Sequence, residues 1–195
     1  MVFTYTTIQG LKKMNEINTP NIEVQCKADN YFSVKTLTVL PHTQENWLTF
    51  FNSETNPTES LSVLFNNAKN NDAKSIEKKQ YVELIISLDP SVAADWEFYG
   101  NGVEYCGADS NCQYNISTEI TDGNTLVLTI AQVEPTYEFL GVDKDNLEKV
   151  VEVTEGKETE YLPISFRYTA KHVPSGKIYM SQDPKIIVRR PGATL

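Results

Sequence analysis

The sequence predicts a mainly β fold, an antiparallel β-sandwich of Ig-like or jelly-roll-like type, and three observations support this. Segments of strand-like, often alternating, apolar and polar residues recur roughly every ten residues, with Gly, Pro, Asn and Asp between them. The apolar residues are rich in Tyr, Phe, Val and Ile, which favour strands. The order of the segments is not the alternation of strands and long helices that βαβ units require.

The first half of the chain carries a predicted hairpin and then the predicted helices. Apolar and polar residues alternate over 22–26 and, with one phase slip, over 32–39, and Asp29-Asn30 between them favours a turn. Between residues 43 and 70 we expect one or two short helices. Apolar side chains recur there at helical spacing after a capping sequence, as at Leu61, Leu64, Phe65 and Ala68.

From residue 80 onward the pattern is mostly that of strands and hairpins. Residues 81–88 are apolar on both faces, which predicts a central strand, and a last strand is expected at 184–190. Turns are expected at Gly100–Gly102, Asp122–Gly123, Glu155–Gly156 and Pro174–Gly176. The second of these is the strongest prediction, because Asp-Gly suits a turn whose two central residues both need positive φ.

The length of 195 residues fits one domain, 1–195, with a helical insertion at 43–79 as an option. The N-terminus lacks the unbroken apolar run of a secretory signal, and no window approaches the ~18 apolar residues of a membrane span. We therefore expect a chain that begins at or near Met1 and is soluble. The expected location is the cytoplasm by default, with non-classical release as the alternative.

The net charge of −9 argues against two classes of partner. Nucleic acid and anionic membranes repel such a surface, and the basic pairs lack the interleaved aromatic residues that stack on bases. We interpret these pairs as solvated; they are Lys12-Lys13, Lys78-Lys79 and Arg189-Arg190. The expected partners are therefore a second copy of the chain or another protein, with a glycan as a further option.

The segment EYCGADSNCQY holds Cys106 and Cys112, separated by five residues. A structural zinc site needs four ligands, and the chain offers no second cysteine pair and only two histidines, His42 and His172. Neither histidine lies in the context of a catalytic base. We predict no metal site and no cofactor. A disulfide between Cys106 and Cys112 stays open, because its geometry is reasonable but a reducing compartment opposes it.

No recognised catalytic motif is present, so we expect a protein that is not an enzyme. The acidic loops, such as residues 141–146, fail the EF-hand pattern and are interpreted as turns. A calcium site of another type stays open there.

One aromatic region carries a binding hypothesis. Aromatic faces beside amides and carboxylates suit glycan or protein recognition, and the candidates are Trp96, Tyr99, Tyr105, Asp109, Asn111 and Tyr114. The competing interpretation is that these aromatic residues fill the core.

Two function hypotheses follow from the sequence. The first is a structural or interaction protein that forms homo-oligomers through sheet faces or edges, with the segment PKIIVRR (184–190) supplying an edge strand. The second is a lectin-like, glycan-recognising module centred on residues 96–114.

Overall fold

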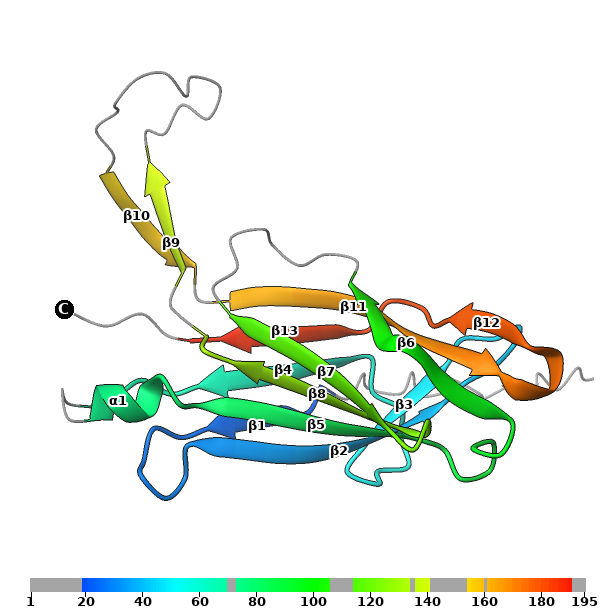
Figure 1. The fold of residues 1–195 in the computed structure, drawn as a ribbon. Helices are drawn as coiled ribbons and strands as arrows, with labels where there is room; N and C mark the ends of the chain where they lie inside the picture. Colours follow the sequence, from blue (N-terminus) through cyan, green and yellow to red (C-terminus); the bar gives the residue numbers. More distant parts are fainter. Residues whose placement is uncertain are drawn as a thin grey trace, which may run out of the picture.

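The chain is mainly β, as the sequence predicts (Figure 1). A computed structural model describes residues 19–69, 73–105, 114–133, 136–140, 154–159 and 161–190. The strands in these ranges form a five-stranded sheet, a six-stranded sheet and a separate two-stranded pair. Two short helical segments accompany them, α1 (Lys74–Glu77) and the 3-10 turn η2 (Val173–Ser175). Within the described ranges no helix has the length and hydropathy needed to cross a membrane.

The five-stranded sheet has β5 at its centre, as predicted from the apolar residues on both of its faces. The strand order is β3 (Leu48–Phe51), β2 (Phe32–Leu40), β5 (Tyr81–Leu88), β8 (Thr125–Ala131) and β7 (Asn115–Thr121). β2 and β5 run parallel, and the other neighbours run antiparallel.

The six-stranded sheet is built around the long strand β11. It contains β1 (Asn21–Val24), β4 (Ser60–Phe65), β13 (Lys185–Arg189), β11 (Tyr161–His172) and β12 (Lys177–Met180) in that order, with β6 (Trp96–Tyr105) also paired to β11. β4 runs parallel to both β1 and β13. Both sheets are therefore mixed, and the prediction of purely antiparallel pairing is wrong, because parallel neighbours are joined by long connections that leave no turn signal.

The two large sheets share one hydrophobic core. Alternate residues of the central strands are buried, as in β5 and β8, so that each sheet turns one apolar face inward. The buried side chains of both sheets form a single cluster that includes Val24, Phe65, Ile86, Leu128 and Val188. Each such side chain stabilises the fold by about 1.5–3 kcal/mol relative to full exposure. The result is a sandwich-like arrangement of two facing sheets.

The helices predicted between residues 43 and 70 are absent from the described part of that segment, which forms β3 and β4 instead. In β4 the helical spacing of Leu61, Leu64 and Phe65 competes with the alternation of Leu61, Val63 and Phe65. The alternation prevails because all three of the latter side chains are buried in the core while β1 and β13 pair with the strand on both edges.

Two predicted hairpins are confirmed. Asp122 and Gly123 both adopt positive φ, 55° and 69°, between the antiparallel strands β7 and β8. The Pro174–Gly176 turn joins β11 to β12, with Gly176 at a φ of 67°. In both cases the turn residues supply the left-handed backbone that the connection requires.

Two other predicted hairpins are wrong. The chain does turn at Asp29–Asn30, where the Asn30 N–H donates to the Lys27 carbonyl at 3.1 Å, but β1 pairs with β4 and β2 with β5, so the turn joins strands of different sheets. Glu155 and Gly156 lie inside β10 (Thr154–Thr159), which pairs with β9 (Thr136–Leu140) through an irregular register. A turn-forming residue marks a position where the backbone can turn, whereas strand pairing decides whether a hairpin forms there.

The sequence Gly100–Gly102 forms a bulge within β6 and does not end the strand. Tyr168 lies opposite Val103 and Ala170 opposite Phe98, so residues 99–102 face Thr169 alone. Both glycines have positive φ, 65° and 75°, which a bulge of this kind needs. The predicted turn residues are therefore used to bend a continuous strand.

Candidate functional site

The sequence-predicted binding residues do not form one surface. Trp96 is only 4% exposed and packs in the core, whereas Tyr99 and Tyr105 are exposed and Tyr114 is half-buried. Trp96 and Tyr105 lie at opposite ends of β6 and opposite His172 and Phe166 of β11, so they are roughly 20 Å apart at the usual rise per residue. Asp109 and Asn111 lie outside the described residues. For Trp96 the competing interpretation, a core aromatic residue, is the one the structure supports.

Tyr105 and Tyr114 do lie near each other on either side of segment 106–113. Burial raises the pKa of the Tyr105 phenol, and the neighbouring Tyr114 phenol raises it further. The predicted disulfide partners, Cys106 and Cys112, lie outside the described residues, so the disulfide stays a prediction.

Cys26 is the described cysteine, and its thiol is held in a structural contact. Its Sγ donates to the Ala73 carbonyl at 3.5 Å. Burial raises the pKa of the Cys26 thiol, with a further contribution from Glu77. A protonated thiol is a poor nucleophile and a poor metal ligand. In the described ranges no three His, Cys, Asp or Glu side chains gather as a metal site would require.

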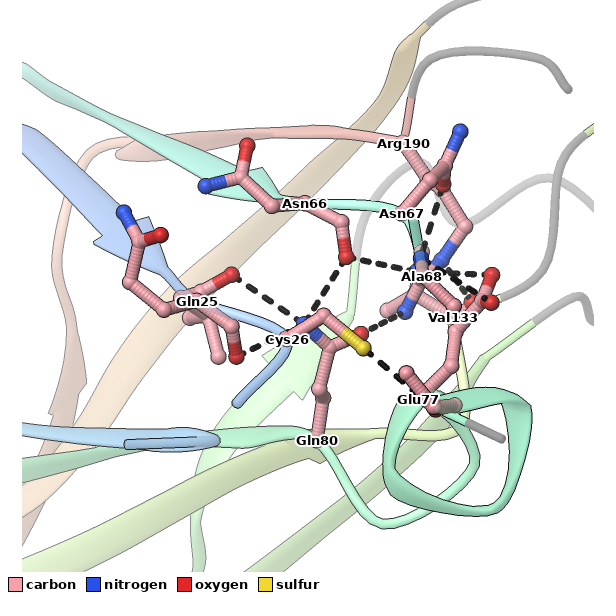
Figure 2. Close-up of polar contacts among 11 residues, drawn as sticks. Gln25, Cys26, Asn66, Asn67, Ala68, Glu77, Gln80, Val133 and Arg190 are labelled. Carbon is pink, nitrogen blue, oxygen red and sulfur yellow. Dashed lines mark hydrogen bonds and ion pairs between the residues drawn. The ribbon is translucent and has the colours of Figure 1, made fainter. Parts of the chain in front are cut away.

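A buried polar cluster surrounds Arg190 near α1 (Figure 2). Arg190 is 3% exposed, which corrects the prediction that Arg189-Arg190 is a solvated pair. Its guanidinium donates to the Gln80 side chain at 2.7 Å, to the Val133 carbonyl and to Glu77 of α1 at 3.2 Å. Gln80, fully buried, donates in turn to the carbonyls of Val24, Gln25 and Asn66 at 2.9–3.1 Å.

The Arg190 cluster has the character of a structural clamp. It ties the residue after β13 to the ends of β1, β4 and β8 and to the start of β5. Buried charges persist when they are paired and hydrogen-bonded, which is the case here. The cluster therefore accounts for stability and provides no evident place for a ligand.

A polar cleft lies on the side of the molecule where β3 meets the 181–184 connection between β12 and β13. We call it the seam cleft; its lining includes Trp47, Thr49, Thr58, Glu59, Tyr168 and Asp183. Its cavity volume is about 230 Å³, below the roughly 300–1,000 Å³ of sites for drug-sized molecules, so it suits only a small ligand.

Hydrogen bonds between the two sheets and within the six-stranded sheet fix the walls of the seam cleft. The Gln182 side chain accepts from the Trp47 N–H at 2.9 Å and donates to the Trp47 carbonyl at 2.6 Å. The Ser181 hydroxyl accepts from the Tyr168 N–H at 2.9 Å and donates to the Gln182 carbonyl at 2.6 Å. The cleft is therefore held in shape before any ligand arrives, which lowers the entropic cost of binding.

Trp47 connects the seam cleft to an aromatic cluster. Its ring packs edge-on against Trp96 at 5.7 Å, and Trp96 also contacts His172 at 5.0 Å and Tyr179 at 5.5 Å. Trp47 and Trp96 are the two tryptophans of the chain. Sequence patterns did not single out the cleft residues, because polar side chains alternating along a strand are normally interpreted as solvent-facing.

A second surface feature is an apolar region on the outer side of the six-stranded sheet. We call it the outer patch; it consists of Tyr99, Ile178 and Met180 around the Lys171–Glu97 ion pair. Ile178 lies opposite Lys171, which lies opposite Glu97, so these side chains share a face. The Lys171 and Glu97 charges are 2.8 Å apart and neutralise each other locally.

No family model matches the chain, and no curated protein sequence matches it. Among solved structures, a cysteine protease inhibitor from Entamoeba histolytica, EhICP2, is similar over 83% of this chain and 98% of its own. The identity is 8% and the TM-score 0.34, an overlap too low to carry an argument about function.

Proposed function

We propose that this protein is a non-enzymatic structural or interaction protein that self-associates through the edge strand β12. The observation that carries the proposal is an edge strand with exposed apolar side chains. The Ig-like or jelly-roll-like topology and the glycan-recognising module at residues 96–114 stay as predictions beside it.

The edge of β12 offers both backbone and side-chain contacts to a partner. Among the described strands β12 pairs with β11 alone, so its other edge carries unpaired N–H and C=O groups. Ile178 is 47% exposed and Met180 52% exposed. Exposed apolar edges of this kind are templates for pairing with a further strand.

The segment PKIIVRR, which the sequence suggests as a strand donated to a neighbour, is already paired within the sheet. Strand β13, which contains most of PKIIVRR, is already paired with β4 on one edge and with β11 on the other. Donation to a neighbour would break both of these pairings.

A second copy of this chain suits the β12 edge because antiparallel pairing about a twofold axis brings identical strands together. The strand has only four residues, whereas stable interfaces bury about 1,200–2,000 Å² in total. Backbone pairing must therefore be supplemented by the outer patch, and we expect a weak dimer.

The net charge predicts how this dimer responds to salt. Each copy carries −9, so two copies repel each other at long range. The outer patch itself is locally neutral because Lys171 pairs with Glu97. Salt screens the long-range repulsion and strengthens the apolar contact, so we expect dimerisation to increase with ionic strength.

Sedimentation velocity over a range of protein concentrations and salt tests the proposal. The wild type should show a concentration-dependent dimer, and the double variant I178K/M180K should be monomeric. Val34→Lys is the matched control, because Val34 is an exposed apolar residue on the other large sheet and should leave the dimer intact. A wild-type monomer at high salt, or a dimer lost only in the Val34 variant, would refute the β12 edge as the interface.

A further inference from the structure

The seam cleft gathers hydroxyl groups from three different segments. Thr49 comes from β3, Thr58 precedes β4, and Tyr168 lies on β11. The Tyr168 phenol is hydrogen-bonded to the Thr49 side chain, and burial raises its pKa, so it keeps its proton. A protonated phenol and two aliphatic hydroxyls can each donate and accept hydrogen bonds.

Thr58 is the member of this group that points to a ligand. The residue is 6% exposed, and its hydroxyl oxygen is enclosed without a hydrogen-bond partner among the described residues. Its backbone N–H is engaged, donating to the Thr49 carbonyl at 2.7 Å, so the main chain is held in place. The hydroxyl can reorient by rotation about the Cα–Cβ bond toward a group entering the cleft. Enclosed polar groups are nearly always satisfied, which makes this one a candidate contact.

The charges of the seam cleft narrow the class of ligand. Two carboxylates, Glu59 and Asp183, line it, and no Lys or Arg is among its described lining residues. Lys185 lines a narrower adjoining space that shares Thr58 and Tyr168. A phosphate, sulfate or carboxylate would meet like charge at the cleft, whereas ligand hydroxyls can donate to the carboxylates and exchange hydrogen bonds with Thr and Tyr.

We propose that the seam cleft binds a neutral polyhydroxylated ligand, such as one sugar ring of a glycan. A fixed cleft that combines carboxylates with threonine and tyrosine hydroxyls matches the ring of hydroxyl groups that a sugar presents. The site differs from the aromatic region at residues 96–114 suggested by the sequence. It does not depend on dimerisation through β12.

Tryptophan fluorescence provides a direct readout, because Trp47 lines the cleft and packs on Trp96, and the chain has no other tryptophan. Emission should be titrated with neutral methyl hexosides and methyl N-acetylhexosaminides up to the millimolar range. Glucuronate and spermidine serve as the anionic and cationic comparisons. We expect a saturable change with at least one neutral sugar and none with glucuronate.

Two valine substitutions test the assignment to the cleft. Thr58→Val keeps the shape of the side chain and removes the unpartnered hydroxyl, so it should weaken sugar binding by tenfold or more. Thr129→Val, on β8 of the other sheet, is the matched control and should bind like the wild type. Circular dichroism and the unfolding curve of each variant confirm that it is folded.

Three outcomes would overturn the proposal. The first is no fluorescence response to any neutral sugar in the panel. The second is saturation by spermidine alone, which would make the cleft an ammonium site of Glu59 and Asp183. The third is equal sugar affinity in the Thr58 variant and the wild type.

Discussion

Replacing Thr58 by valine should make the ligand-free protein more stable. The Thr58 hydroxyl is enclosed and lacks a partner among the described residues, and an unsatisfied enclosed polar group costs about 1–3 kcal/mol. Valine has the same β-branched shape, so the surrounding contacts are preserved. The backbone bond from Thr58 to Thr49 is unaffected. We expect the free energy of unfolding to rise by about 1–2 kcal/mol.

Urea unfolding followed by tryptophan fluorescence measures this change. The midpoint should move to higher urea with the slope m unchanged, and the melting temperature should rise by about 2–8 °C for a chain of this size. Thr49→Val is the matched comparison: it removes the hydroxyl bonded to Tyr168, so it should lower the free energy of unfolding by about 1–3 kcal/mol. A lower midpoint for the Thr58 variant would show that its hydroxyl is satisfied in the free protein, and the reasoning would fail.

Two further predictions concern the buried polar residues. Arg190→Leu leaves Gln80 and the Val133 carbonyl without their buried donor, so it should lower the free energy of unfolding by about 3–5 kcal/mol. Arg189→Leu, at the neighbouring exposed position, should change the free energy of unfolding by less than about 0.5 kcal/mol. Equal losses in the two variants, measured by urea unfolding, would contradict a clamping role for Arg190. Burial raises the pKa of the Tyr168 phenol above its ordinary 10.0, so the unfolded chain releases this proton first. The free energy of unfolding should therefore be constant below about pH 10 and fall as the pH rises further. Urea midpoints measured across this range should fall less steeply for Tyr168→Phe than for the wild type.

Local patterns predicted the elements whose signals are contained within a few residues. The apolar run of β5, the Asp122-Gly123 hairpin and the Pro174–Gly176 turn all have their determinants in the residues that form them. Neighbouring residues in the sequence determine whether a turn adopts positive φ and whether a strand is apolar on both faces, so these predictions did not depend on distant partners.

The errors arose where a distant partner decides the outcome. Strand β4 is flanked by β1 and β13, and β2 by β3 and β5. Neither arrangement is recorded in the local sequence, so β4 was predicted as a helix and β2 as the partner of β1. The same limit applies to Arg190, whose buried guanidinium is bonded to carbonyl groups of residues that follow β8 and β4, far away in the sequence. Propensity is a weak prior, and tertiary pairing overrides it.

The candidate site was hidden from sequence patterns for a related reason. Thr49, Thr58 and Tyr168 come from separate segments and line one cleft, where Gln182 also joins the two sheets at Trp47. Residues from three distant segments have no fixed spacing in the sequence that a motif could detect. Only the packed structure shows that these hydroxyls share one cleft.

The two buried polar regions differ in how fully their hydrogen bonds are made, and this difference separates structure from function. At one end, Arg190 and Gln80 direct their side-chain donors to carbonyls, to each other and to Glu77. At the seam cleft, Thr58 keeps an enclosed hydroxyl that nothing in the described chain engages. A buried network whose hydrogen bonds are all made rigidifies a core, whereas a hydroxyl without a partner beside a cleft can still form a hydrogen bond to a ligand. The seam cleft is therefore the place to seek a ligand, and the Arg190 cluster is the place to seek stability.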